Sequence, residues 1–230
     1  MNYLVGDIGN TFIKISILNS NFKIKKIYNL KTEKIYHNNS KKKFLNKFRK
    51  KNLYTKVLFS SVVPKAFKII KKDLSKKEFN VFEIKEVDMK KIIKIKVKKY
   101  DQLGSDRISN AVGSLRYSNS IIIDFGTATT FDIVKNGTYV GGVISPGINL
   151  SILNLNKSTA LLPILNLKNK QKSYGKNTQE ALNAGFLWGY EGLINNIIKK
   201  IYSKSNLKFT IILTGGYAKL FKRYIKNKTI

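Results

Sequence analysis

The sequence predicts an α/β protein made of two similar domains, and three observations support this prediction. An Asp-x-Gly sequence followed closely by Thr occurs twice, at Asp7 and at Asp124, about half a chain apart. Each copy ends an apolar strand and precedes a second strand. After each copy, further strands and helices follow in the same order, and 230 residues are enough for two small cores.

In the first half, the segment from Tyr3 leads to Asp7, and a run with period two places Ile13, Ile15 and Ile17 on one face of a second strand. Pro64 suits the first turn of a helix, where its missing N–H costs nothing. The further elements that we expect are strands at 22–28, 55–60 and 80–84, a helix at 40–51 with Phe44, Leu45 and Phe48 inward, and a helix opening at Pro64.

In the second half, Asn136-Gly137 predicts a tight hairpin, and Asn177 followed by Glu180 predicts a capping box at a helix start. The expected elements are strands at 120–123, 139–144 and 209–213, a helix at 178–202 with Leu182, Phe186, Leu193, Ile197 and Ile201 near one face, and a last helix after Gly215-Gly216. A helix at 105–117, with Ile108, Ala111, Val112 and Leu115 inward, joins the halves. We therefore expect domains at 1–117 and 118–230, with a cleft between them.

The composition excludes several classes of function. Cys is absent, which removes disulfides, thiolate metal sites and cysteine nucleophiles, and the single His37 makes a Ser/His/Asp triad improbable. No apolar run approaches the ~18 residues of a membrane span, and Asp7 interrupts the apolar N-terminus, so no signal peptide is expected. These features predict a cytoplasmic protein that does not enter the membrane.

The formal net charge is +31, and it has two possible explanations. Of the basic residues, 40 are Lys and 4 are Arg, although Arg is the residue that reads bases and binds phosphates in two-point contacts. Residues 104–166 hold only four basic side chains. This distribution favours a compositional bias on solvated faces, with polyanion binding as the alternative. We do not expect specific nucleic-acid binding.

The two Asp-containing turns are candidate phosphate loops. A turn of Gly, Asn and Thr between two strands directs backbone N–H groups and hydroxyls to one point, which suits a phosphate. Asp at the strand end can hold a cation that neutralises the phosphate. One such turn also makes an ordinary hairpin, but two at matching positions predict a pair of loops that bind a polyphosphate from both sides.

Three further segments each allow two interpretations. Gly141-Gly142 with Pro146-Gly147 either lets backbone approach a ligand or shapes a crowded turn. Thr214-Gly215-Gly216 is either an anion site at a helix start or a tight strand-to-helix turn. Gly104-Ser105-Asp106-Arg107 is either a helix-capping cluster or a carboxylate base beside a substrate-anchoring Arg.

Taken in order, the segments at Asp7–Lys14, Gly104–Arg107, Asp124–Thr129, Gly141–Gly147 and Thr214–Gly216 resemble those of type III pantothenate kinases, and the match runs to about Ala218. The resemblance implies two duplicated ribonuclease-H-like domains of the actin and sugar-kinase type with an ATP cleft. It implies phosphorylation of pantothenate by ATP, the first step toward coenzyme A. It also implies a homodimer, Mg²⁺, and a monovalent cation, K⁺ or NH₄⁺.

The resemblance also assigns site residues. Asp106 corresponds to the proton acceptor and Asp124 to the ligand of the monovalent cation. The expected ATP contacts are Asp7, Ile8, Gly9, Asn10, Thr11, Phe12, Ile13, Lys14 and Thr127. The expected pantothenate contacts are Tyr100, Gly104, Ser105, Asp106, Arg107 and Thr178.

The sequence departs from the family pattern at two places. Tyr100-Asp101-Gln102-Leu103 is shorter than the family's segment and has no Asn-Pro. Members of the family have a closing segment, with the last strand of the second domain, and we do not expect this segment in the present sequence after the final helix. Two alternatives to a pantothenate kinase remain: a non-enzymatic transcription accessory factor of the same family, and a kinase or phosphatase of the superfamily acting on a sugar or polyphosphate.

Overall fold

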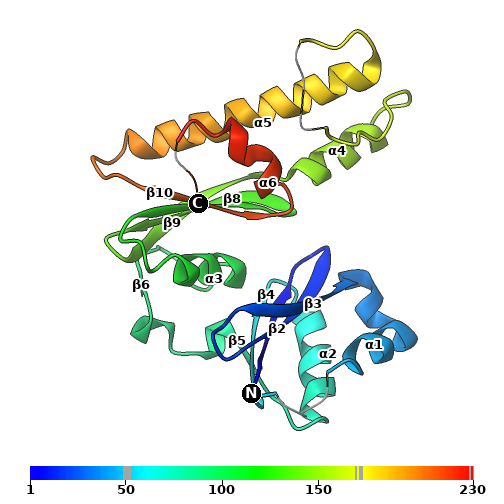
Figure 1. Cartoon of the computed structure of the whole chain (residues 1–230), viewed down its shortest axis with the longest axis vertical. Coiled ribbons are helices and arrows are strands. Elements are labelled where there is room, and N and C mark those ends of the chain that lie inside the picture. Colours follow the sequence, from blue (N-terminus) through cyan, green and yellow to red (C-terminus); the bar gives the residue numbers. More distant parts are fainter. Residues whose placement is uncertain (49–52, 169, 171–172, 228, 230) are drawn as a thin grey trace. The chain divides into compact units, whose positions relative to one another are not determined.

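The computed structural model describes residues 1–48, 53–168, 170, 173–227 and 229 (Figure 1). The chain divides into two compact units. The first unit comprises residues 1–94 and 98–112, and the second comprises residues 95–97 and 113–230. Each unit contains one mixed five-stranded sheet, so the α/β fold class predicted from the sequence is confirmed.

The first sheet has the strand order β3-β2-β1-β4-β5. β1 runs antiparallel to β2 and parallel to β4, so the Asp7 loop lies where β1 turns back into β2. The bounds of the strands are Tyr3–Ile8 for β1, Phe12–Leu18 for β2, Ile24–Lys31 for β3, Lys56–Ser61 for β4 and Asn80–Glu83 for β5.

Two helices and a 3-10 turn cover one face of this sheet. They are η1 (Thr32–Tyr36), α1 (Asn38–Leu45) and α2 (Pro64–Ser75), and α2 begins at Pro64 as predicted. Phe44, Leu45 and Phe48 are buried as expected. The helix predicted for 40–51 begins earlier and ends at Leu45, while its expected end at Lys51 lies outside the described residues.

Short elements follow β5. They are η2 (Ile84–Glu86), η3 (Met89–Lys91), β6 (Lys94–Ile95) and α3 (Ser105–Gly113). The prediction that α3 reaches Tyr117 was wrong, because residues after Gly113 form a turn that leads into the next strand. Ile108 and Ala111 of α3 are fully buried, whereas Val112 and Leu115 are only partly buried.

The second sheet repeats the topology of the first. Its order is β10-β7-β8-β9-β6, so the run β9-β8-β7-β10 corresponds to β3-β2-β1-β4. β7 pairs antiparallel with β8 and parallel with β10, as β1 does with β2 and β4. The bounds are Ser120–Phe125 for β7, Ala128–Lys135 for β8, Thr138–Pro146 for β9 and Thr210–Gly215 for β10. The duplication expected from the two Asp loops is therefore present.

Positive φ angles at Asn136 and Gly137 form the predicted hairpin between β8 and β9. β10 is the outermost strand on its side of this sheet, and an isolated parallel bridge joins its Ile211 to Thr229.

Three helices pack on one face of the second sheet: α4 (Ile148–Lys157), α5 (Thr178–Tyr202) and α6 (Ala218–Phe221). The long helix α5 has the predicted bounds, and the Asn177 side chain accepts the Glu180 N–H at 2.9 Å. The Glu180 carboxylate accepts from Lys176 N–H, one residue before the capping box would place that bond. Among the described residues, no helix is long and apolar enough to cross a membrane.

The face of α5 that turns inward differs from the predicted one. The buried side chains are Asn183, Ala184, Leu187, Tyr190, Ile194, Ile198 and Ile201, so only Ile201 of the predicted set is fully inside. Leu182, Phe186, Leu193 and Ile197 are partly buried beside that core. Since α5 is apolar on more than one side, the sequence pattern could not decide which side meets the sheet.

Candidate functional site

The Asp7 loop is a tight turn between β1 and β2 that the surrounding chain supports from two sides. Gly6 lets the strand pass close to the core, because a Cβ there would lie within 1.9 Å of the Phe59 ring. The Gly9 N–H bonds to the Phe12 carbonyl at 3.0 Å and closes the turn. The loop that the sequence predicts for ATP thus has a fixed backbone.

Thr32, the first residue of η1 directly after β3, supports the same loop, a role that the sequence did not indicate. Its hydroxyl donates to the Gly9 carbonyl at 2.7 Å, and its N–H donates to the Thr11 carbonyl at 3.0 Å. Only 4% of Thr32 is exposed. A lone Thr at the start of a 3-10 turn carries no sequence signal for this role, because the two partners lie over 20 residues away.

Lys14 and Asp7 are register partners on β2 and β1, and Asp106 lies close enough to Asp7 to interact with it. Burial raises the pKa of Asp7, the Lys14 ammonium lowers it, and the Asp106 carboxylate raises it. The Asp7 residue is also exposed to solvent, at the carboxyl end of the central strand β1, so water weakens the net pKa shift. Two carboxylates and one ammonium therefore gather at the carboxyl end of β1.

The Gly104–Arg107 turn fixes Asp106 at the first turn of α3. An Asp106 carboxylate oxygen accepts the Arg107 N–H at 2.8 Å. A Cβ on Gly104 would lie 2.3 Å from the same oxygen and 3.7 Å from Val62, which follows β4. A side chain at position 104 would therefore displace this carboxylate from the place where it accepts the Arg107 N–H. Ser105 is the first residue of the helix and is buried.

Tyr100 lies in the turn before this segment and is partly exposed. Burial and the nearby Glu83 carboxylate raise the pKa of its hydroxyl above the ordinary value of a tyrosine. The structure thus brings Asp7, Lys14 and Asp106 together in the first unit, with Tyr100 close to the end of β5.

In the second unit, the Asp124 loop is closed by a bond from Gly126 N–H to the Ala128 carbonyl at 3.0 Å. Gly147 packs on this loop, since a Cβ there would lie 2.1 Å from the Thr127 carbonyl oxygen. The structure therefore supports the crowded-turn interpretation of Pro146-Gly147.

Gly215 has a φ of +88°, and a Cβ there would lie 2.6 Å from an Asp124 carboxylate oxygen. The Gly216 N–H donates to the Phe125 carbonyl at 3.0 Å. The helix that follows, α6, is a single turn of 4 residues. Thr214-Gly215-Gly216 thus makes a tight turn against Asp124, and the helix after it is too short for an anion site.

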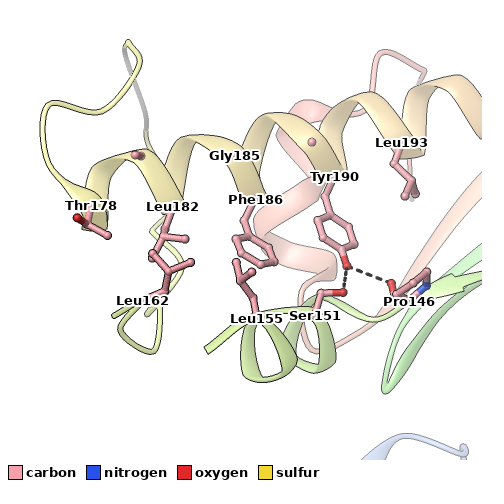
Figure 2. A pocket seen from close by; sticks show the side chains of 12 residues that line it. Pro146, Ser151, Leu155, Leu162, Thr178, Leu182, Gly185, Phe186, Tyr190 and Leu193 are labelled. Carbon is pink, nitrogen blue, oxygen red and sulfur yellow. Dashed lines mark hydrogen bonds between the residues drawn. The ribbon is translucent and has the colours of Figure 1, made fainter. Parts of the chain in front are cut away.

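Thr178 is exposed at the first turn of α5 and lines an apolar groove between α4 and α5, shown in Figure 2. The groove has a volume of about 560 Å³. The Tyr190 hydroxyl lies at its base, 2.8 Å from the Ser151 hydroxyl and 3.2 Å from the Pro146 carbonyl. Leu155, Leu162, Leu182, Phe186 and Leu193 form most of its walls.

The duplicated sheets, each with an Asp at the turn between its antiparallel central strands, define a protein of the actin and sugar-kinase fold. Similar solved structures include a candidate transcriptional activator of the Baf family from Campylobacter jejuni, with a TM-score of 0.62, 20% identity, and coverage of 98% of this chain and 89% of that one. Another is the activator of 2-hydroxyisocaproyl-CoA dehydratase from Clostridium difficile, with bound ADPNP, a TM-score of 0.57, 12% identity, and coverage of 100% and 88%. At these identities the likeness concerns the fold.

The family described as Type III pantothenate kinase matches residues 3–200. The Type III pantothenate kinase of Pelagibacter ubique is 46% identical over 229 residues, which cover 98% of this chain and 91% of the relative. That of a Sulfurihydrogenibium species is 36% identical and covers 94% and 89%. This chain belongs to the type III pantothenate kinase family.

Proposed function

We propose that the cluster of Asp7, Lys14 and Asp106 is the place where this chain carries out the reaction of its family, the phosphorylation of pantothenate by ATP that begins coenzyme A synthesis. The observation that carries the proposal is the position of Asp106. Its carboxylate is fixed by the Arg107 N–H, has room because residue 104 is Gly, and lies near the strand-end Asp7.

ATP is the phosphoryl donor, and its proposed contacts are the loop Asp7–Lys14 and Thr127. Backbone N–H groups of a fixed turn and the Lys14 ammonium both suit phosphate oxygens. The bonds from Thr32 to Gly9 and Thr11 stabilise this turn before ATP arrives, so little reorganisation is needed on binding.

Asp106 is the proposed proton acceptor. A primary alcohol attacks phosphorus better when a carboxylate orients its hydroxyl and takes its proton. Arg107 is suited to bind a carboxylate of the substrate in a two-point contact. Tyr100, Gly104, Ser105 and Thr178 complete the proposed pantothenate contacts.

Mg²⁺ and a monovalent cation, K⁺ or NH₄⁺, are the proposed ions. Their preferred ligands are oxygens, and the strand-end Asp7 and Asp124 each supply a carboxylate. Gly215 lets the turn pack closely against Asp124, since a Cβ there would lie 2.6 Å from the carboxylate, so this oxygen ligand is held at the end of β7. When bound, such ions neutralise the charge of the phosphates.

We also propose a cytoplasmic homodimer with the domain limits expected above, 1–117 and 118–230. The groove between α4 and α5 is the proposed contact surface for the second copy. Leu155, in the wall of this groove, is 37% exposed, and apolar side chains form most of the lining, which favours a protein contact. Light scattering should show a dimer that Leu155→Glu, in the groove, converts to a monomer and that Tyr174→Glu, outside the groove, leaves intact.

The deciding experiment is an assay of the purified chain with ATP, Mg²⁺, K⁺ and pantothenate, in which each component is omitted in turn. Formation of phosphopantothenate should require all four. Two results would contradict the proposal: ATP consumption that does not depend on pantothenate, or no phosphopantothenate when every component is present. Replacing pantothenate with a hexose or polyphosphate tests the other kinases and phosphatases of the superfamily.

A further inference from the structure

Three neighbouring strands place Lys14, Asp7 and Ser60 in one row. Asp7 of β1 is the register partner of Lys14 on β2 and of Ser60 on β4. The residues before and after these positions, such as Ile13 and Phe59, are fully buried in the core on the other face of the sheet. Because side chains alternate between faces along a strand, Ser60 lies on the same face as Asp7, one strand away.

The hydroxyl oxygen of Ser60 is buried, and among the described residues it has no hydrogen-bond partner. Nearly all buried polar groups in folded proteins are hydrogen-bonded, and an unsatisfied one lowers stability. A hydroxyl one strand from the Asp7 carboxylate, at the carboxyl end of a parallel strand pair, is therefore a candidate for satisfaction by a ligand.

The second copy of the fold has a hydroxyl at the matching position. Asp124 of β7 is the register partner of Thr214 on the parallel strand β10, as Asp7 is of Ser60 on β4. Both halves thus place a hydroxyl residue beside the strand-end Asp, on the parallel neighbour. The first half combines it with the Asp106 carboxylate, so we expect the reacting groups there.

We propose that the Ser60 hydroxyl donates a hydrogen bond to an oxygen of the phosphoryl group that is transferred from ATP. This inference depends on the site proposed above. An ionised carboxylate can only accept hydrogen bonds, whereas a hydroxyl can donate one. The oxygens of a phosphoryl group in transfer carry the negative charge of the transition state, and a fixed donor beside them stabilises that charge.

Ser60→Ala tests the proposal, because a structural role and a phosphate-binding role predict different results. Removing an unsatisfied buried hydroxyl should leave the Tm of the free protein equal or higher. At the same time kcat should fall by about 10²-fold, as when one donor to a developing anion is removed. The KM for pantothenate should stay unchanged. Ser16→Ala, on the same face of β2, is the matched control and should retain full kcat.

A binding measurement locates the contact on the phosphoryl group. In the wild type, a non-hydrolysable ATP analogue should raise the Tm more than ADP does, both with Mg²⁺. Ser60→Ala should lose most of that difference and keep the shift with ADP. Ser60→Cys, which preserves the size of the side chain and donates weakly, should show the same losses, and it replaces Ser60→Ala if the latter does not fold.

Two results together would overturn the inference: a Ser60→Ala enzyme with a kcat within twofold of the wild type, and a full difference between the Tm shifts that the ATP analogue and ADP cause in it. The Asp106→Asn variant separates this outcome from failure of the site itself. If Asp106→Asn is inactive while Ser60→Ala is fully active, only the role of Ser60 is wrong. If Asp106→Asn is also fully active, the proposed site is wrong.

Discussion

Replacing Asp106 with Asn removes the carboxylate that we propose as proton acceptor and changes little else in the turn. The Asn side-chain oxygen can still accept the Arg107 N–H, which Asp106 accepts at 2.8 Å. Loss of the negative charge at the α3 N-terminus costs about 0.3–1 kcal/mol, and relief of the interaction with Asp7 opposes that cost. The Tm should therefore remain within about 4 °C of the wild type.

The effect on the reaction should be far larger. Removal of a general base lowers the rate by about 10²-fold or more. A 10²-fold loss corresponds to about 2.7 kcal/mol of transition-state stabilisation. The assay is kcat with saturating ATP and pantothenate, together with the Tm shift caused by ATP, which should be unchanged.

If Asp106 only stabilised the start of α3, kcat would barely change in Asp106→Asn. Asp106→Ala would then be the more damaged protein in stability, since Ala cannot accept the Arg107 N–H. A kcat of Asp106→Asn near that of the wild type would refute the assignment of Asp106 as base.

Three further predictions concern the monovalent cation, the Asp7 carboxyl group and the positive charge of the chain. If Asp124 binds the monovalent cation, replacing KCl with NaCl at equal ionic strength should lower kcat strongly, and equal rates would count against that role. Since burial and Asp106 raise the pKa of Asp7 in the folded state, the contribution of Asp7 to stability should fall as pH rises from the unfolded pKa, about 3.9, through the higher folded value. Asp7→Asn should accordingly melt above the wild type at pH 7, with no advantage below about pH 3.9, and should lose activity; a lower Tm at pH 7 would contradict this account. If the charge of +31 is compositional, binding to DNA should be independent of sequence and fall steeply with salt, and a specific Kd of about 10⁻⁸ M at ~150 mM salt would show otherwise.

Features encoded within a few neighbouring residues could be predicted from the sequence. The apolar strands ending at Asp7 and Asp124, the hairpin at Asn136-Gly137 and the start of α5 after Asn177 all depend on local chemistry: turn glycines, strand periodicity and a cap. The repeated Asp loops also revealed the duplication, because each copy carries its own signal.

Features that join distant segments required the tertiary structure. Asp7 and Asp106 are about 100 residues apart in sequence, yet they interact, and the register that sets Ser60 beside Asp7 exists only once β1 and β4 pair. Likewise, the bonds from Thr32 to the first loop depend on where β3 ends. The alternation of apolar and polar residues shows which face of a strand is buried, but it does not show which strands become neighbours.

The long helix α5 shows the same division. The sequence determined where it begins and ends, because capping and helical periodicity are local. The sheet and α4 decided which of its apolar sides is buried: Leu187 and Ile194 turn inward, and Phe186 lines the groove. Because α5 carries apolar residues on more than one side, burial of any of these sides would remove apolar area from water. Only the complete packing of the second unit selects the side that is buried.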